Sequence, residues 1–178
     1  MEENAPSLFD APSGPSIWKM NWPALGEEAG ACTRCRLHQG RTHVVFGEGS
    51  QASPVMFVGE GPGEQEDHTG RPFVGRAGQL LDKILAAAGI PRDSVYITNM
   101  VMCRPPGNRN PQRDEVDACW PFLQRKIQLI QPRVIATLGN VPTQFFLKTT
   151  QGITRTRGQF YPWKGGVEVF PMYHPSYL

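Results

Sequence analysis

Residues 54–67 read PVMFVGEGPGEQED, an apolar segment that changes at once into a glycine-rich, acidic loop. An unbroken apolar run of this length predicts a strand buried on both faces. Residues 76–88 then space four aliphatic side chains at helical intervals before a glycine, so a helix follows. The order strand, loop, helix is the repeating unit of an α/β fold.

The same unit recurs along the rest of the chain. Further strands are predicted at 94–101, 133–139 and 166–173, and further helices at 113–130 and 141–148. We therefore expect a three-layer α/β/α sandwich with a central four-stranded, mostly parallel sheet. The functional loops of such a sheet gather at the carboxyl ends of its strands.

The chain has 178 residues, enough for one domain with its own core. Residues 1–23 carry four prolines among small and polar residues without helical or strand period, so we expect a loose proline-rich N-terminal arm before a single domain at 24–178. No apolar run is long enough for a membrane helix, and the N-terminus lacks a signal-peptide pattern. We expect a cytoplasmic monomer that does not contact a membrane.

Four cysteines lie in two pairs, Cys32 and Cys35 in a Cys-x-x-Cys motif, and Cys103 and Cys119 farther along the chain. Without an export signal the thiols should stay reduced, which disfavours disulfides and favours bound metal. The Cys-x-x-Cys turn supplies two thiolates, and folding must bring Cys103 and Cys119 close to them. Spacing alone leaves zinc and an iron–sulfur cluster both open.

The loop at 59–67, GEGPGEQED, lacks the Gly-Lys-Ser/Thr ending of a P-loop and the spacing of a dinucleotide fingerprint. Its acidic side chains would also repel phosphate. A glycine loop with carboxylates better suits a neutral planar ligand and a water molecule oriented by Glu60 or Glu66. Taken alone, a tight turn with solvated acids explains the loop equally well.

Three further residues stand at or beyond predicted strand ends. Asn99 can offer a donor and an acceptor to a base edge, His174 can hydrogen-bond a developing anion, and Phe73 can offer a stacking face. Each has a simpler interpretation by itself, as a strand cap or a core ring. Because the strand ends of an open parallel sheet converge on one edge, the combination with Glu60 favours a shared site.

These residues stand in motifs that resemble family 4 uracil-DNA glycosylases, the iron–sulfur type of the uracil-DNA glycosylase superfamily. The resemblance runs from about Cys32 to Leu178. Its motifs, in order, are GEGPGEQED at 59–67, GRPFVGRAGQLLD at 70–82, YITNMVMCRPPGNRNP at 96–111, Cys119 and HPSYL at 174–178.

The resemblance implies hydrolysis of the bond between uracil N1 and deoxyribose in single- or double-stranded DNA, which releases free uracil and leaves an abasic site. The target nucleotide must first leave the base stack. Phe73 would stack on the uracil, and Asn99 would pair with O4 and N3–H, an edge that cytosine reverses. His174 would donate toward O2 as charge develops there.

The resemblance also implies a four-iron four-sulfur (4Fe-4S) cluster. Its ligands would be Cys32, Cys35, Cys103 and Cys119.

Backbone groups around Gly61 would hold the hydrolytic water. The best-known glycosylase family has an aspartate where this chain has Gly61, so we rank Glu60 first for orienting the water, with Glu66 and Asn108 as the other candidates. The loop after Asn108 lacks the histidine-bearing insertion through which a related group bonds covalently to the abasic product, so ordinary turnover is expected. Family members usually continue past HPSYL, and we expect a chain truncated at Leu178.

A second hypothesis is a non-catalytic iron–sulfur module that binds nucleic acid or accompanies a polymerase. An enzyme should lose excision when His174 or Asn99 is replaced, whereas a binding module has no excision to lose. The net charge of +2 does not by itself indicate a nucleic-acid partner, but binding to DNA should weaken as salt rises. The arginines expected to contact phosphates are Arg104, Arg109, Arg155 and Arg157.

Overall fold

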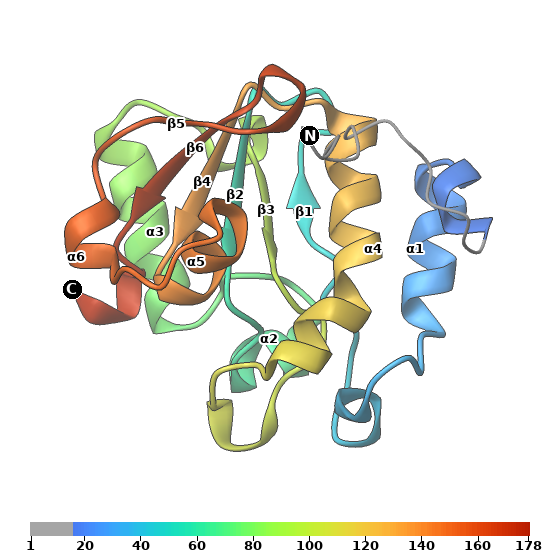
Figure 1. Ribbon diagram of the computed structural model, residues 1–178. Helices are drawn as coiled ribbons and strands as arrows, with labels where there is room; N and C mark the ends of the chain where they lie inside the picture. The colour runs from blue at the N-terminus through green and yellow to red at the C-terminus, as the bar shows by residue number, and fades with distance from the viewer. Residues whose placement is uncertain (1–15) are drawn as a thin grey trace.

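The computed structural model describes residues 16–178 as an α/β fold with helices on both faces of a sheet (Figure 1). The sheet has six strands in the order β1-β3-β2-β4-β6-β5. The strands are β1 Glu48–Gly49, β2 Val55–Gly59, β3 Tyr96–Asn99, β4 Val134–Leu138, β5 Tyr161–Pro162 and β6 Glu168–Met172. The α-helices are α1 Trp22–Gly30, α2 Glu64–Thr69, α3 Arg76–Ala87, α4 Arg113–Ile130, α5 Asn140–Leu147 and α6 Ile153–Thr156.

The predicted layers and the four predicted strands are confirmed. Strands β3, β2, β4 and β6 pair in parallel as the centre of the sheet. The sheet has six strands rather than the predicted four, because β1 and β5 add antiparallel edges to β3 and β6. Each edge strand is two residues long and carries no apolar period, so the sequence gives no signal for it.

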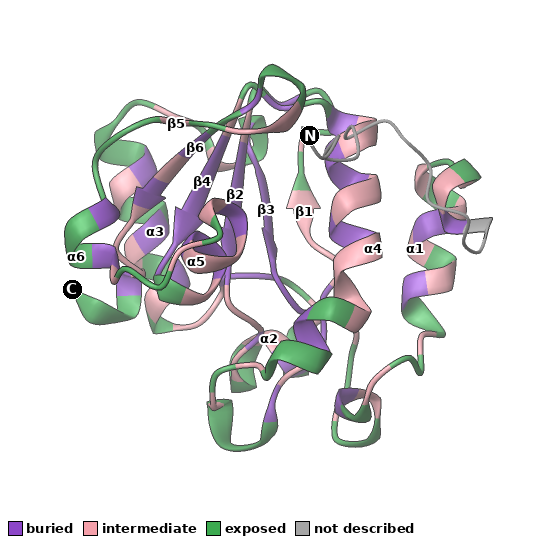
Figure 2. Cartoon of the chain, viewed as in Figure 1, coloured by how far each residue is buried: buried purple, intermediate pink, exposed green. Residues whose placement is uncertain are grey.

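Strand β2 shows how the core is divided between the two faces of the sheet. Met56 and Val58 are buried in the core on the side of α4 and α5, whereas Phe57 is buried with Leu81 and Leu85 of α3 on the other side. This alternation follows from the two-residue period of a strand. Figure 2 shows the central strands and the inner side of α4 as buried.

Helix α1 forms an outer layer beyond α4. Leu25 of α1 and Ile17 of the preceding 3-10 turn, Ser16–Lys19, are buried against Phe122 of α4. Residues 1–15 of the expected N-terminal arm lie outside the described residues. The remainder of that segment, 16–23, packs on the fold through Ile17, and its one proline, Pro23, lies in the first turn of α1.

The loops that follow the four parallel strands all emerge at one edge of the sheet, beyond Gly59, Asn99, Leu138 and Met172. This edge is where an open parallel sheet carries its ligands. None of the helices between residues 16 and 178 combines the length and apolarity that a bilayer crossing requires.

Candidate active site

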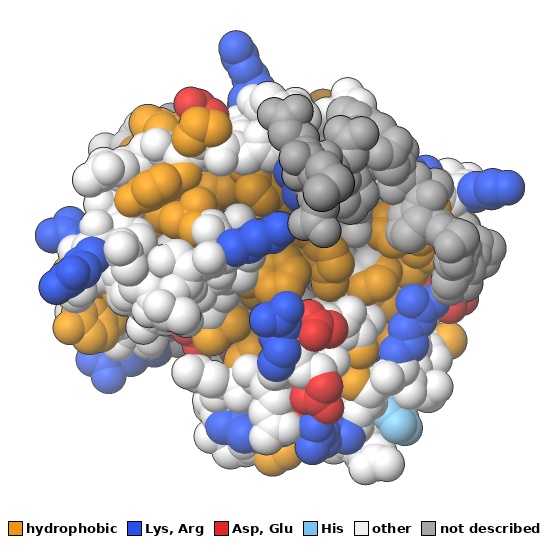
Figure 3. All heavy atoms as spheres, in the orientation of Figure 1, with side chains coloured by type: hydrophobic (Ala, Val, Ile, Leu, Met, Phe, Trp, Pro, Cys, Tyr) orange, Lys and Arg blue, Asp and Glu red, His pale blue; other side chains and the backbone are white. Residues whose placement is uncertain are grey.

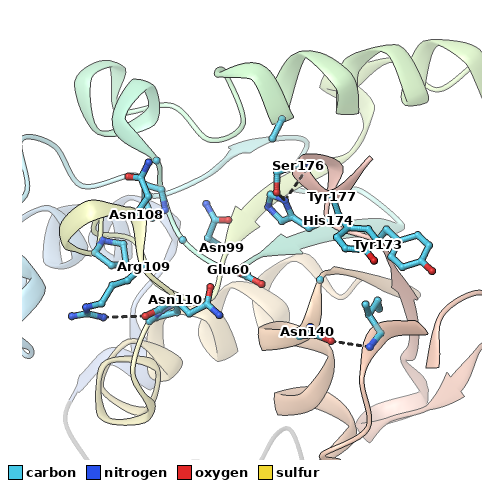
Figure 4. A pocket seen from close by; sticks show the side chains of 18 of the residues that line it. Glu60, Asn99, Asn108, Arg109, Asn110, Asn140, Tyr173, His174, Ser176 and Tyr177 are labelled. Carbon is cyan, nitrogen blue, oxygen red and sulfur yellow. Dashed lines mark hydrogen bonds between the residues drawn. The ribbon is translucent and has the colours of Figure 1, made fainter. Parts of the chain in front are cut away.

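A pocket of about 640 Å³ opens at the carboxyl ends of the parallel strands (Figure 4). It is bounded by the loops after β2, β3, β4 and β6, so residues far apart in sequence meet there. The residues predicted to handle uracil or water all line it, and they are Glu60, Gly61, Glu66, Phe73, Asn99, Asn108 and His174.

Asn99, the last residue of β3, is 4% exposed at the inner end of the pocket. Its Oδ1 is buried and has no hydrogen-bond partner among the residues that the structure describes. A buried amide oxygen without a donor is costly. The neighbouring Gly59 allows this placement, because a Cβ there would lie 2.4 Å from Oδ1 of Asn99. The pocket therefore holds an unmet acceptor.

Phe73 lines the pocket and also belongs to the core, at 5% exposure. Its ring centroid lies 5.8 Å from that of His174, with the planes tilted by 35°. Its backbone has φ +49°, a conformation that is rare for a bulky residue. Gly78 of α3 packs against this backbone, since a Cβ there would lie 1.9 Å from the carbonyl oxygen of Phe73. The ring is thus held in one place.

Glu66 fixes the segment that carries Phe73. Its Oε1 accepts the main-chain N–H groups of Val74 at 3.0 Å and Gly75 at 2.9 Å. Gly75 is the residue before α3, so Glu66 satisfies the main-chain N–H of the N-cap residue, which the helix itself leaves without a partner. The carboxylate lines the pocket but is already engaged by the chain.

His174 has a defined tautomer. Its Nδ1 lies 3.1 Å from the main-chain nitrogen of Ser176 and 2.7 Å from the Ser176 hydroxyl. The main-chain N–H can only donate, so Nδ1 accepts and the neutral ring carries its proton on Nε2. Burial lowers the pKa of His174, although the Glu66 carboxylate opposes the shift. A neutral imidazole with a free Nε2–H donor results.

Glu60 follows β2 and lies opposite Asn99 and His174 in Figure 4. Burial raises the pKa of its carboxyl, against a hydrogen bond donated by the main-chain N–H of Val141. Gly139, with φ +93°, leaves room for it, because a Cβ there would lie 3.0 Å from Oε1 of Glu60. Glu60 is thus a carboxyl with a raised pKa and no Lys or Arg within ion-pair distance among residues 16–178.

Asn108 stands at the entrance of the pocket, where its Oδ1 accepts a 2.7 Å hydrogen bond from Nε of Arg104. Asn140 and Tyr173 are among the lining residues that were not foreseen. Asn140 comes directly after β4 and Gly139, and its Oδ1 accepts from the main-chain N–H of Ile153 at 2.8 Å. Asn99 and His174 were selected as polar residues at or beyond predicted strand ends, and the same criterion applied to the strand at 133–139 would have selected Asn140.

The cysteines lie outside this pocket, and all of them are free thiols. Burial raises the pKa of Cys35, Cys103 and Cys119, the last to about 12, and the thiols also act electrostatically on one another. The two distant pairs are therefore neighbours in space. Nη1 of Arg41 donates to the main-chain oxygen of Cys32 at 2.6 Å and approaches Sγ of Cys103 at 3.5 Å.

Within residues 16–178, no three His, Cys, Asp or Glu side chains are grouped tightly enough to hold one metal ion.

The arginines expected to contact DNA have different surroundings. Arg109 makes two hydrogen bonds to the buried Glu115, at 2.9 and 2.7 Å, and is held by them. Arg155 and Arg157 are exposed and lie in or beside α6, whose first residue lines the pocket. Figure 3 shows basic side chains scattered singly over one face of the molecule, without a continuous basic patch.

Comparison with known proteins agrees with this geometry. Residues 46–178 match the model of the uracil DNA glycosylase superfamily. The chain belongs to this superfamily. A type-4 uracil-DNA glycosylase of Thermotoga maritima is 51% identical over 155 residues, which cover 86% of this chain and 81% of the relative. Another from Sulfurisphaera tokodaii is 48% identical over 160 residues, covering 85% and 73%.

The predicted family 4 resemblance is thus confirmed. A DNA polymerase of Bacillus phage SP01 is also similar, with 36% identity over 131 residues, 73% of this glycosylase-family chain but 14% of the polymerase.

Proposed function

We propose that this pocket binds uracil flipped out of DNA and hydrolyses its bond to deoxyribose. The observation that carries the proposal is the buried Oδ1 of Asn99, which has no hydrogen-bond partner among the described residues. Uracil presents N3–H as a donor beside the O4 acceptor, so one amide side chain can satisfy both. Cytosine has an acceptor at N3 and a donor at N4, and would leave Oδ1 and N3 facing each other.

The aromatic wall and the histidine complete the binding of the base. The fixed ring of Phe73 offers a face on which uracil stacks. The Nε2–H of neutral His174 donates to O2, where negative charge gathers as the bond to the sugar breaks. A neutral donor suits this task, because it stabilises the anion without protonating it.

Residues of the loop after β2 contact the hydrolytic water and the sugar. We propose that the main chain at Gly61 holds the water and that Glu60 orients it and faces the positive charge on the sugar. Glu60 is preferred to Glu66 because the Glu66 oxygen Oε1 already accepts two main-chain N–H groups. Asn108, bound to Arg104 at the entrance, is better placed to contact DNA than water.

We further propose that Cys32, Cys35, Cys103 and Cys119 hold a four-iron four-sulfur cluster. The thiols lie close enough to act electrostatically on one another, and the resemblance to family 4, the iron–sulfur type, favours a cluster over zinc. The cluster would tie the segments around 32–35 and 103 to α4. We infer a structural role for the cluster, since none of the four cysteines lines the pocket.

Single- and double-stranded oligonucleotides with one uracil test the activity. After alkali, strand cleavage at uracil but not at cytosine supports the proposal, and release of free uracil identifies the reaction. No cleavage by protein that carries its cluster would refute it. We propose a monomer acting in the cytoplasm, where free thiols persist, and size-exclusion chromatography with light scattering tests the monomer.

The similarity to a phage DNA polymerase favours one second candidate, a non-catalytic module of a replication protein. Replacement of Asn99 or His174 separates the two, because only an enzyme has excision to lose. The complete pocket at the sheet edge supports the enzyme.

A further inference from the structure

Helix α2 has no apolar side chain, since its residues read EQEDHT. It follows β2 and lies at the carboxyl edge of the sheet (Figure 1). Asp67 is its buried side chain, at 4% exposure, whereas most of the others are exposed. A helix this short is unstable by itself, and without an apolar face it gains little from hydrophobic packing. Polar contacts must therefore hold α2 in place.

Asp67 makes such contacts with the segment that follows the Cys-x-x-Cys turn. Its Oδ1 accepts the main-chain N–H of Thr42 at 2.8 Å and that of His43 at 3.3 Å. Nδ1 of His43 donates in return to the main-chain oxygen of Asp67 at 2.8 Å, because a carbonyl can only accept. Burial alone would raise the pKa of Asp67, but the hydrogen bonds from this segment lower it overall. Asp67 is therefore an ionised and fully engaged carboxylate.

The segment that Asp67 contacts is itself fixed at both ends. Arg41 donates through Nη1 to the main-chain oxygen of Cys32 at 2.6 Å. Farther along, the main-chain N–H of Val45 donates to the main-chain oxygen of Met102 at 2.8 Å. Residues 41–45 are thus held on each side of the contact with α2, close to the cysteines. They form a fixed support for the helix.

Glu66 makes the corresponding contacts on the pocket side of α2. Its carboxylate lines the pocket and accepts the main-chain N–H groups of Val74 and Gly75, directly after Phe73. Asp67 does not line the pocket. Successive residues of a helix point about 100° apart, so neighbouring side chains contact different parts of the fold. One turn of α2 therefore joins the cysteine segment to the segment that carries the aromatic wall.

We propose that Asp67 is a positioning residue for the base in the pocket. It fixes α2 to residues 41–45, so that Glu66 holds the Phe73 segment and the ring stays where uracil stacks. This inference rests on the proposed function. Without the Asp67 carboxylate, α2 loses its buried anchor, and the ring of Phe73 is no longer held in one place.

Binding without turnover tests this role. Two otherwise identical single-stranded oligonucleotides carry either 2′-fluoro-2′-deoxyuridine, which resists hydrolysis, or 2′-fluoro-2′-deoxycytidine at one position. Fluorescence anisotropy measures the affinity of the protein with its cluster for each. Wild type should bind the uridine oligonucleotide more tightly. Asp67→Ala should weaken that binding by about 2- to 30-fold, the range for residues that act through an intervening network, and leave affinity for the cytidine oligonucleotide unchanged.

Two further variants separate the contact from the fold. Asp67→Asn keeps an oxygen that accepts both main-chain N–H groups and should recover most of the lost affinity. His43→Ala removes the returning hydrogen bond at an exposed position and should weaken uridine binding by a smaller factor. Unchanged uridine affinity in Asp67→Ala would overturn the proposal. If that variant does not fold, unchanged affinity in His43→Ala would overturn it.

The combination of Asp67→Ala with Glu66→Ala tests whether Asp67 acts through Glu66. If it does, the double variant should bind the uridine oligonucleotide about as weakly as Glu66→Ala alone, because changes in one network do not add. Losses that multiply in the double variant would show two independent effects and would refute the connection through α2.

Ile130→Ala is the matched control for stability. Ile130 is 6% exposed at the end of α4 and does not line the pocket. A cavity there should destabilise the fold and leave both affinities unchanged. An equal loss of uridine affinity in Ile130→Ala would mean that any destabilisation has this effect, which would overturn a specific role of Asp67. If wild type binds both oligonucleotides equally and excises no uracil, the proposed function fails instead.

Discussion

Nδ1 of His174 lies 3.1 Å from the main-chain nitrogen of Ser176, two residues further along the chain. A main-chain N–H cannot accept, so this contact assigns the only ring proton of neutral His174 to Nε2. The donor that faces the pocket is thus defined by backbone geometry immediately after β6.

Replacement of His174 by alanine should lower the rate of uracil excision by about 10²–10³-fold, the cost of removing one donor from a developing anion. Affinity for DNA should change little, because the donor acts mainly as charge develops. Single-turnover excision and fluorescence anisotropy on the same oligonucleotide measure the two effects. Equal losses in rate and affinity would assign His174 to ground-state binding.

Asn99→Asp should reduce the preference for uracil over cytosine. An ionised aspartate accepts at both oxygens and so matches the N4 donor of cytosine better than O4 of uracil. The ratio of excision rates on otherwise identical uracil and cytosine oligonucleotides measures the change. Asn99→Ala is the control, since it removes both groups and should lower uracil excision without favouring cytosine. An unchanged ratio in Asn99→Asp would show that another group reads this edge.

Helices and strands were predictable where the apolar pattern repeats over many residues. Residues 113–130 were predicted as a helix and form α4 over the same residues. The two-residue edge strands and the short helix α2, Glu64–Thr69, were not predicted, because a few residues carry no period.

Helix α2 also changes how the acidic loop is understood. Glu64, Glu66 and Asp67 lie in its first turn, where carboxylates interact favourably with the helix N-terminus. The buried Asp67 accepts main-chain N–H groups from Thr42 and His43. Because strand ends converge, the residues predicted for one site do line one pocket, but the sequence could not separate acids that accept main-chain N–H groups from an acid that is free to act on a ligand. That distinction depends on hydrogen bonds between distant segments.

Glu66→Ala should therefore affect activity by displacing the segment that carries Phe73. It leaves the main-chain N–H groups of Val74 and Gly75 without their acceptor, and we expect a loss of about 1.5–3 kcal/mol in the free energy of unfolding. The released Phe73 segment should raise KM for uracil DNA more than it lowers kcat. Glu66→Gln keeps an accepting oxygen and should recover most of both. A kcat loss in Glu66→Gln as large as that in Glu60→Gln would restore Glu66 as the catalytic acid or base.

Glu60→Gln should lower kcat by about 10²–10⁴-fold, as expected for loss of a general base. Because burial raises the pKa of Glu60, the acid limb of the wild-type pH–rate profile should lie above pH 4.5. That limb should vanish in the residual activity of the variant. A wild-type profile flat down to pH 4.5 would contradict the role.

The same carboxyl links pH to stability. A raised pKa means that the folded protein holds this proton more tightly than the unfolded chain, so the stabilisation is present at low pH and is lost as pH rises through the folded pKa. Glutamine stays neutral throughout. Glu60→Gln should therefore be more stable than wild type at pH 7 and similar to it near pH 4, as urea unfolding at both pH values would reveal.

Lys126 provides a separate test of how the core tolerates charge. It is 1% exposed, and Nζ donates to the main-chain oxygen of Phe46 and lies 4.1 Å from the centroid of the Phe46 ring. Burial lowers the pKa of Lys126 to about 7, and Cys119 opposes this shift. An unfolded lysine titrates near ~10.4, so between these values the unfolded chain binds more protons and stability rises with pH.

Lys126→Met, similar in length but without a charge, should abolish this rise. Urea unfolding at pH 7, 8 and 9 measures the free energy of unfolding of both proteins. As pH increases, the wild type should gain stability relative to Lys126→Met by a few kcal/mol at most (about 1.4 kcal/mol per pH unit for one proton). Lys83→Met, at an exposed position of α3, is the matched control and should show no such trend. Parallel curves for wild type and Lys126→Met would mean that Lys126 remains protonated in the core across this range.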